Sequence, residues 1–266
     1  MKPTFIITSA IDTNVGVYSP EIRLLQTHET LNSLQKFYPD AIFVLVEGGR
    51  HIADFDPTNT QVAQSELSLL WSRLKSRCHY VLNMSNNDQI KHLHNNFLNN
   101  MNYKNEMGGT TGLTKTVAEL TLMAAALNAL STQEKLKPAL EVDRIFKISG
   151  RYQLSPLHDP AVYAVDQFKD KIIFKQREAS WMTDALNTIG TDHSFCSRLW
   201  SFPVSRYDEV MEKFNSMIED CLETSNKHYI DMEHLLFKHL HAADTAELDY
   251  LHLMGTIAPN GIVTYD

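Results

Sequence analysis

Four short polar segments each follow an apolar run of the sequence. The one with the most chemical potential is Ser149-Gly150-Arg151, directly after the apolar run 144–148. Glycine lets another group approach the backbone closely, and the neighbouring arginine offers a planar fork of donors that suits a diphosphate. The alternative is a tight turn, in which Gly150 serves only the backbone and Arg151 is solvated. The other three segments are Thr8-Ser9-Ala10, Glu47-Gly48-Gly49 and the residues from Asn83 onward.

A second candidate is the acidic segment Asp231-Met232-Glu233-His234. A carboxylate here could take a proton from a hydroxyl, act as a nucleophile or stabilise positive charge at a reacting carbon. Asp231 also stands where a helix N-cap is expected. The alternative is therefore capping of the helix and compensation of its dipole.

The glycine-rich segment 108–112, followed by Lys115, is a third candidate. Free N–H groups at a helix N-terminus could hold an anion there. The segment does not match GxxxxGK[ST], so a Walker-type nucleotide site is not expected. The favoured alternative is a flexible linker before a helix that begins at Thr116, with Thr116 and Glu119 forming a capping box.

These segments need a frame of strands and helices that brings them together. Apolar, β-branched runs predict strands at 4–11, 41–49, 79–84 and 144–148, and later ones, expected to be antiparallel, at 171–175 and 194–203. Periodic apolar residues predict helices at 19–37, 62–76, from 116, around 210–221 and at 232–240. Strand–helix–strand units of this length give parallel strands. In such sheets ligands bind beyond the carboxyl ends of the strands.

The predicted fold is therefore α/β: a single domain over residues 1–266 with a mixed, mostly parallel central sheet flanked by helices. The asparagine-rich stretch 85–112 has little apolar periodicity and is predicted to be a long mobile loop that could close over a site. It carries Lys91, His92, His94 and Lys104.

Composition narrows the class of protein. The chain has 24 basic and 32 acidic residues, a net charge of −8, which argues against a general nucleic-acid binder but leaves room for a local basic groove. Its three cysteines show no CxxC spacing, which favours a reducing, cytoplasmic compartment. The 12 histidines show no metal-ligand spacing. The N-terminus is predicted to be a strand rather than a signal peptide, and no run reaches the length of a membrane span.

Taken in order, several segments resemble a group of phage and large-virus proteins that is similar to nucleotide-sugar glycosyltransferases of the GT-A type. The segments are FIITSAI, RLLQTHETLNSLQKFYPDAIFVLVEGG, KTVAEL, RIFKISGRYQL, WSFP, YIDMEHLLFKHL and GTIAPNG. The resemblance covers nearly the whole chain, and ISGRY is its most distinctive part. It implies a GT-A-like, Rossmann-like domain.

The resemblance also implies roles for residues. Thr8 and Ser9 would border the nucleoside of the donor, and Ser149, Gly150 and Arg151 would reach its diphosphate. Lys115 and Lys147 would add positive charge for the donor. Asp231 and Glu233 would be the catalytic or acceptor-contacting carboxylates, and Lys91, His92 and Lys104 would belong to the acceptor side or to a lid.

The sequence departs from GT-A enzymes at one point. Those enzymes commonly carry a DxD pair for Mn²⁺ or Mg²⁺ after the strand that delivers the diphosphate. This chain has Ser149-Gly150-Arg151 there, and Asp143 lies at the other end of the strand. No metal ligand is assigned, and Arg151, with Lys147 or Lys115, is expected to offset the charge of the departing diphosphate.

The resemblance implies a glycosyltransferase that moves a sugar from a nucleotide donor, with a UDP-sugar favoured, to a hydroxyl acceptor. The acceptor stays open. One candidate is a hydroxymethylated base in phage DNA that receives glucose or arabinose in the host cytoplasm, with Arg198 and Arg206 adding to a basic face. The other is a surface or protein-linked glycan. Alternatives to transfer are a non-catalytic module that binds nucleotide sugars or glycans, and a nucleotidyltransferase.

Overall fold

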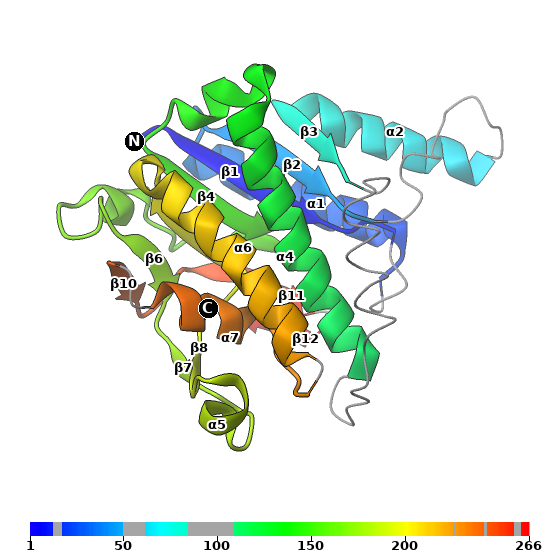
Figure 1. Ribbon diagram of the computed structural model, residues 1–266. Coiled ribbons are helices and arrows are strands. Elements are labelled where there is room, and N and C mark those ends of the chain that lie inside the picture. Colours follow the sequence, from blue (N-terminus) through cyan, green and yellow to red (C-terminus); the bar gives the residue numbers. More distant parts are fainter. Residues whose placement is uncertain are drawn as a thin grey trace.

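A seven-stranded sheet forms the centre of the protein (Figure 1). The structure, a computed structural model, describes residues 1–12, 18–49, 62–84, 109–225, 227–241, 244–257 and 262–265. The strand order is β10-β6-β9-β4-β1-β2-β3. The strands are β1 (Pro3–Ser9), β2 (Ile42–Glu47), β3 (Tyr80–Asn83), β4 (Arg144–Ser149), β6 (Ile172–Lys175), β9 (Leu199–Pro203) and β10 (Thr245–Leu248). Only β9 runs against its neighbours in this sheet, which confirms the predicted mixed, mostly parallel sheet.

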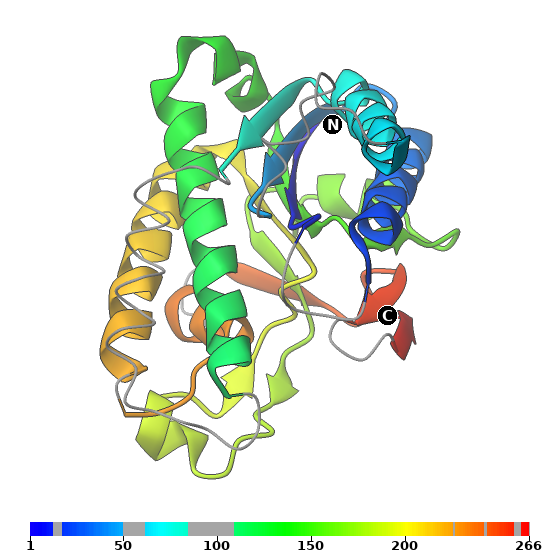
Figure 2. The ribbon, with the colours of Figure 1, turned by 90° about the vertical axis from the view of Figure 1, so that its right-hand side faces the viewer.

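Helices cover both faces of the sheet (Figure 2). On one face lie α1 (Pro20–Phe37) and α2 (Val62–Arg77). On the other lie α4 (Gly109–Thr132), α6 (Tyr207–Thr224) and α7 (Met232–Leu240). No helix in the described part of the chain is both long and apolar enough to cross a membrane.

The alternation of side chains along β1 explains the two layers. Ile6 packs into the apolar core under α4 and α6, whereas Phe5 and Ile7 belong to the core under α1 and α2. All three side chains are fully buried. Complete burial of such a side chain contributes about 1.5–3 kcal/mol, so both helical layers are held to the sheet mainly by this apolar contact.

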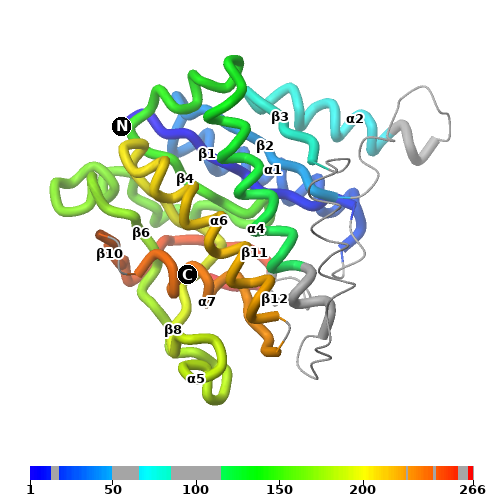
Figure 3. Tube along the Cα trace, in the orientation of Figure 1, coloured from blue at the N-terminus to red at the C-terminus, as the bar shows by residue number. Residues whose placement is uncertain are grey.

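Two smaller sheets flank the main one. In the first, β5 (Tyr152–Leu154) pairs with β11 (Leu253–Ile257), which in turn pairs with β12 (Ile262–Tyr265). In the second, β7 (Glu178–Ala179) pairs with β8 (His193–Ser194). We call residues 178–194 the β7–β8 arm. It carries α5 (Ala185–Ile189) and projects from the main body (Figure 3).

Several boundaries differ from those that the sequence predicts. Helix α4 begins at Gly109, so residues 109–112 are helical rather than part of a loop. Thr116 and Glu119 therefore lie inside a helix, and the predicted capping box is wrong. A glycine costs a helix about 1 kcal/mol, which is less than the 24-residue helix gains from its buried later turns. The N-cap Ser19 makes no side-chain capping bond.

The predicted strand 194–203 is also shorter, because β9 begins at Leu199. Strand β6 is antiparallel to β9, as predicted, but it is parallel to β10, a strand that the sequence did not predict. Residues 85–108 lie outside the described residues, so the predicted mobile loop stays a prediction there.

Candidate functional site

The carboxyl ends of β1, β2 and β4 meet at one edge of the main sheet. In the parallel register, Ser9 pairs with Glu47 and Thr8 pairs with Ser149. The backbone N–H of Gly150 donates to the carbonyl of Thr8 at 2.8 Å, which extends the β1–β4 ladder past the strand end. Asn83, at the end of β3, pairs with Glu47 in the same way, so all four predicted segments reach this edge.

Glu47 shapes the chain that follows β1. Its side chain is fully buried, and Oε1 accepts hydrogen bonds from the backbone N–H groups of Ile11 at 2.9 Å and Gly49 at 2.6 Å. Burial raises the pKa of Glu47, against the hydrogen bonds and the charge of Arg23, which lower it. A Cβ on residue 49 would lie 2.5 Å from Oε1 of Glu47, so this position requires glycine.

Gly150 has a structural task as well. Its carbonyl accepts a hydrogen bond from Oγ1 of Thr27 on α1 at 3.0 Å, and a Cβ on residue 150 would lie 3.1 Å from that oxygen. The close contact between α1 and the end of β4 therefore depends on the missing side chain. The backbone alternative raised for Gly150 is supported by this contact, which also fixes where Arg151 leaves the sheet.

Two arginines lie against the ring of Tyr152. The guanidinium carbon of Arg198 is 5.5 Å from the ring centroid and that of Arg151 is 6.0 Å from it. Burial raises the pKa of Tyr152, and the charges of both arginines oppose this shift. Arg198 is held beside β4 because its carbonyl accepts from the N–H of Ser149 at 3.0 Å.

Lys115 and Arg23 extend this group of positive charges. Burial lowers the pKa of Lys115, the charges of Arg151 and Arg23 lower it further, and Glu233 opposes them. Arg23 is itself buried, with Nη1 donating to the carbonyl of Ala10 at 3.1 Å. We call Arg23, Lys115, Arg151 and Arg198 the cationic cluster. Like charges held this close disfavour one another, so a bound anion would relieve their repulsion.

Lys147 of β4 links α4 and the segment before β9 to the end of its own strand. Its side chain is fully buried, and Nζ donates to Glu119 Oε1, to Ser149 Oγ at 2.9 Å and to the carbonyl of Ser197 at 2.6 Å. An ammonium group has three hydrogens. All three are taken up by these partners, so any contribution of Lys147 to donor binding would come from its positive charge, and that role stays a prediction. Glu119 is its ion-pair partner rather than a capping residue.

Glu233 lies in the first turn of α7 with the electrostatics of an acid–base group. Its Oε1 accepts a hydrogen bond from Ser197 Oγ at 2.6 Å. Burial raises the pKa of Glu233 to about 7, with the negative charges of Asp231 and Glu119 adding to the shift. A carboxyl group with a pKa near the working pH can both give and take a proton efficiently.

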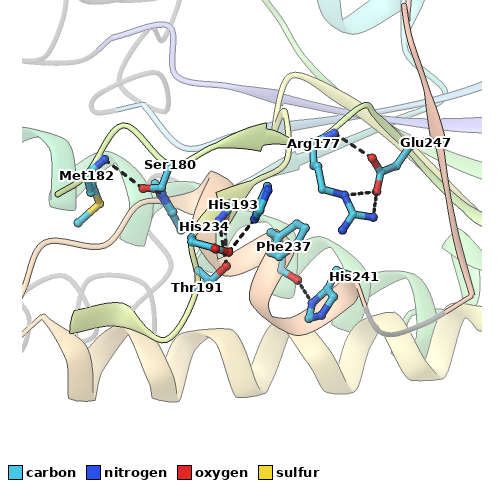
Figure 4. Close-up of polar contacts among 10 residues, drawn as sticks. Arg177, Ser180, Met182, Thr191, His193, His234, Phe237, His241 and Glu247 are labelled. Carbon is cyan, nitrogen blue, oxygen red and sulfur yellow. Dashed lines mark hydrogen bonds and ion pairs between the residues drawn. The ribbon is translucent and has the colours of Figure 1, made fainter. Parts of the chain in front are cut away.

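The side chain of Asp231 caps the N-terminus of α7. It is the N-cap of α7, and Oδ1 accepts from the backbone N–H of His234 at 3.0 Å and contacts Nδ1 of the same residue at 2.6 Å. The capping alternative therefore describes Asp231, which influences Glu233 through its charge. On the far side of the imidazole, Nε2 of His234 lies 2.8 Å from Oγ of Ser180 in the β7–β8 arm (Figure 4).

Other predicted residues do not join this edge. Lys91, His92, His94 and Lys104 lie outside the described residues. Arg206 follows the end of β9, at the opposite edge of the sheet from Arg198, and donates to Asp244 at 2.7 Å. It therefore cannot share a basic face with Arg198 beside the strand ends.

A metal ion needs several ligand side chains gathered in one place. Among the described residues, no group of three or more His, Cys, Asp or Glu side chains is placed to hold one. The position after β4, where a DxD pair would stand, holds Ser149, Gly150 and Arg151. The charges at this edge are the cationic cluster together with the carboxylates of Glu119 on α4 and Glu233 on α7.

The sequence analysis did not predict Arg23 as a residue of the site, nor Lys147 as the ion-pair partner of Glu119. Arg23 could have been noticed in the sequence, because it lies near the N-terminus of α1, where the helix dipole disfavours a positive charge. The pairing of Glu119 with Lys147 joins residues 28 positions apart in different elements, and no local pattern reveals it.

Solved structures to which the chain is similar include three glycosyltransferases. The galactosyltransferase LgtC, in complex with donor and acceptor sugar analogues, shares 9% identity and a TM-score of 0.46 over 90% of this chain and 70% of that one. The mannosyltransferase Ktr4p from S. cerevisiae shares 8% identity and a TM-score of 0.47 over 90% and 65%. Core-mannan synthase A from Aspergillus fumigatus, in a Mn/GDP form, shares 8% identity and a TM-score of 0.42 over 97% and 75%.

No protein-family model matches the sequence, and no curated protein matches it. Similarity to structures at 8–9% identity does not transfer an activity. Function has to be argued from the chemistry of the site itself.

Proposed function

We propose that this chain is a glycosyltransferase that moves a sugar from a nucleotide-sugar donor to a hydroxyl acceptor. The observation that carries the proposal is the place of Glu233 beside the strand ends: it accepts from Ser197, whose carbonyl accepts from Lys147, and its charge acts on Lys115 of the cationic cluster. Transfer from a nucleoside diphosphate sugar needs both parts. The leaving diphosphate needs positive charge, and the attacking hydroxyl needs a group that takes its proton.

In the proposed reaction, the acceptor oxygen forms a bond to the anomeric carbon while the bond from that carbon to the diphosphate oxygen breaks. The leaving oxygen keeps the electron pair, and Arg151, Lys115 and Arg23 of the cationic cluster offset its charge. The acceptor proton passes to the carboxylate of Glu233, whose pKa of about 7 allows it to release the proton again at neutral pH.

The remaining strand-end residues have supporting roles in this proposal. Thr8 and Ser9 border the nucleoside, and the backbone at Ser149 and Gly150 faces the diphosphate. Arg151 supplies a bidentate fork, which a lysine does not reproduce. A UDP-sugar is the favoured donor, on the resemblance seen in the sequence. No residue is assigned to a metal ion in this proposal, since the described residues hold no group of three or more His, Cys, Asp or Glu side chains.

Donor binding tests the proposal first. Thermal shifts would be measured with a panel of UDP- and GDP-sugars, with and without Mn²⁺, on the wild type and on Arg151→Ala and Arg151→Lys. We expect at least one donor to stabilise the wild type, the alanine variant to lose most of the shift and the lysine variant to keep part of it. If every donor that binds also stabilises Arg151→Ala fully, the diphosphate has been placed wrongly.

Turnover separates the enzyme from a binding module. A donor that binds but yields no nucleoside diphosphate with any acceptor would identify a non-catalytic nucleotide-sugar module. The matched variant is Glu233→Gln, which should bind the donor and lose turnover. A hydroxymethylated DNA base would need basic residues beyond those described, such as Lys91, His92 and Lys104, and activity on it should fall steeply with salt.

A further inference from the structure

An aromatic pair, made of an exposed tryptophan and a half-buried tyrosine, lies beside the proposed site. Trp181, on the β7–β8 arm, is 55% exposed. Its ring centroid is 6.0 Å from that of Tyr229, and the two planes are inclined by 52°. The other two tryptophans of the chain, Trp71 and Trp200, are 5% and 1% exposed. An exposed indole does not gain the favourable free energy that burial of its large aromatic surface would give. Exposed tryptophans therefore commonly mark binding sites.

Tyr229 connects the pair to the reacting carboxyl. It lies in the segment between α6 and α7, two residues before the helix cap Asp231 and four before Glu233. Burial raises the pKa of Tyr229, and the negative charges of Asp231 and Glu233 raise it further. The pair therefore adjoins the carboxyl group that would deprotonate the acceptor.

Hydrogen bonds hold Trp181 in this place. The preceding residue, Ser180, contacts Nε2 of His234 on α7 at 2.8 Å through Oγ, and the same oxygen accepts from the N–H of Met182 at 3.0 Å (Figure 4). The backbone N–H of Ser180 also donates to the carbonyl of Asp192 across the arm at 2.7 Å. Both neighbours of Trp181 are thus hydrogen-bonded, and such support of the backbone suits the presentation of an aromatic ring to a ligand.

The charges around the pair select the class of ligand. The arm exposes Glu178, Asp184 and Asp192. The basic residues next to the arm are both paired: Arg177 donates to Glu247 at 2.7 Å, and Lys175 donates to Glu178 at 3.1 Å. A polyanion such as DNA would bring phosphates against these carboxylates, whereas a neutral ligand would not meet that repulsion.

We propose that Trp181 and Tyr229 form the acceptor subsite and that the acceptor is a neutral saccharide, one ring of which stacks on Trp181 with a hydroxyl directed toward Glu233. A pyranose ring presents C–H groups of weakly positive character, which the negative face of an indole attracts. The subsite itself requires only the aromatic pair and its support. The orientation toward Glu233 rests on the proposed function.

Fluorescence offers a direct test, because Trp181 is the exposed tryptophan and the other two are buried. Quenching by acrylamide would be measured with maltose, lactose and cellobiose as probes. We expect at least one disaccharide to protect the emission of the wild type, and no disaccharide to protect Trp181→Ala, whose residual emission comes from the buried residues. The control Tyr250→Ala removes another exposed aromatic side chain, 64% exposed, and should keep the protection.

The result that overturns the inference is the absence of protection by any of the three disaccharides, or equal protection in Tyr229→Ala and the wild type. Protection by an oligonucleotide containing hydroxymethylcytosine, lost as salt is raised, would also overturn it in favour of DNA. Trp181→Phe checks that the effect is stacking, because it should restore saccharide-dependent activity in part.

Donor hydrolysis keeps this test separate from the proposed function. Trp181→Ala should release nucleoside diphosphate from the donor, with water as acceptor, at the wild-type rate, while kcat/KM for a saccharide acceptor falls about tenfold or more. If donors bind but no saccharide protects Trp181, the subsite is wrong and the transferase proposal stands. If saccharides protect Trp181 but no donor binds, the transferase proposal fails and the subsite remains.

Discussion

Replacing Glu233 by glutamine should stabilise the fold, and the gain should grow with pH. In the folded protein the pKa of Glu233 is raised from its ordinary value of 4.5 to about 7, first by burial and then by Asp231 and Glu119. Between these two values the unfolded chain has lost the proton while the folded protein still holds it. The wild type is therefore most stable, with respect to this group, below the unfolded pKa of 4.5. Its free energy of unfolding falls as pH rises toward and through the folded pKa of about 7. Glutamine has no proton to lose and escapes this penalty.

The size of the effect follows from the shift. Each pKa unit corresponds to about 1.4 kcal/mol, so the free energy of unfolding of Glu233→Gln relative to the wild type should rise from about 1 kcal/mol at pH 5 to about 3 kcal/mol at pH 8. Both values are upper bounds, because the side chain is only half-buried and the bond from Ser197 is weaker to an amide than to a carboxylate.

Urea unfolding of both proteins at several pH values between 5 and 8 measures this difference. The control is Glu219→Gln, which changes an exposed glutamate on α6 and should show little dependence on pH. A difference for Glu233→Gln that is the same at every pH, or that shrinks as pH rises, would refute the reasoning about the charge of Glu233.

Three further substitutions test the supports of the site. Lys147→Met should lower the free energy of unfolding by about 3 kcal/mol in chemical denaturation, because Glu119 loses its buried partner, and adding Glu119→Leu should recover part of the loss. Gly255→Ala should cost about 1–3 kcal/mol and weaken donor binding in calorimetry, because its Cβ would lie 2.5 Å from the carbonyl oxygen of Arg151. Asp231→Ala should lower the melting temperature, because it removes an N-cap worth about 1 kcal/mol. If these three measurements showed no change, the contacts described would be contradicted.

Local patterns predicted most of the main sheet and its helices. Strand β4 and helix α7 could be found because apolar runs and caps lie within a few residues of each other. The sheet of β5, β11 and β12 could not, because its pairing joins residues as distant as Gln153 and Met254. The start of α4 was misplaced because glycines weaken a helix locally while packing that is distant in sequence stabilises it.

The candidate site divides in the same way. The rule that ligands bind at strand ends predicted that Thr8, Glu47 and Ser149 would share an edge, and the register confirms this. The contact of Lys147 with Glu119 and the approach of Trp181 to Tyr229 depend on elements far apart in sequence. The roles of these residues in binding and catalysis stay predictions.

The most direct test of the central claim is the release of nucleoside diphosphate from a panel of UDP- and GDP-sugars, with disaccharides as acceptors, by the wild type, Arg151→Ala and Glu233→Gln. We expect the wild type to turn over at least one donor, and Arg151→Ala to need a much higher concentration of that donor for the same rate. Glu233→Gln should bind the donor normally but release nucleoside diphosphate far more slowly. Full turnover by Glu233→Gln, or the same dependence on donor concentration in Arg151→Ala and the wild type, would contradict the account.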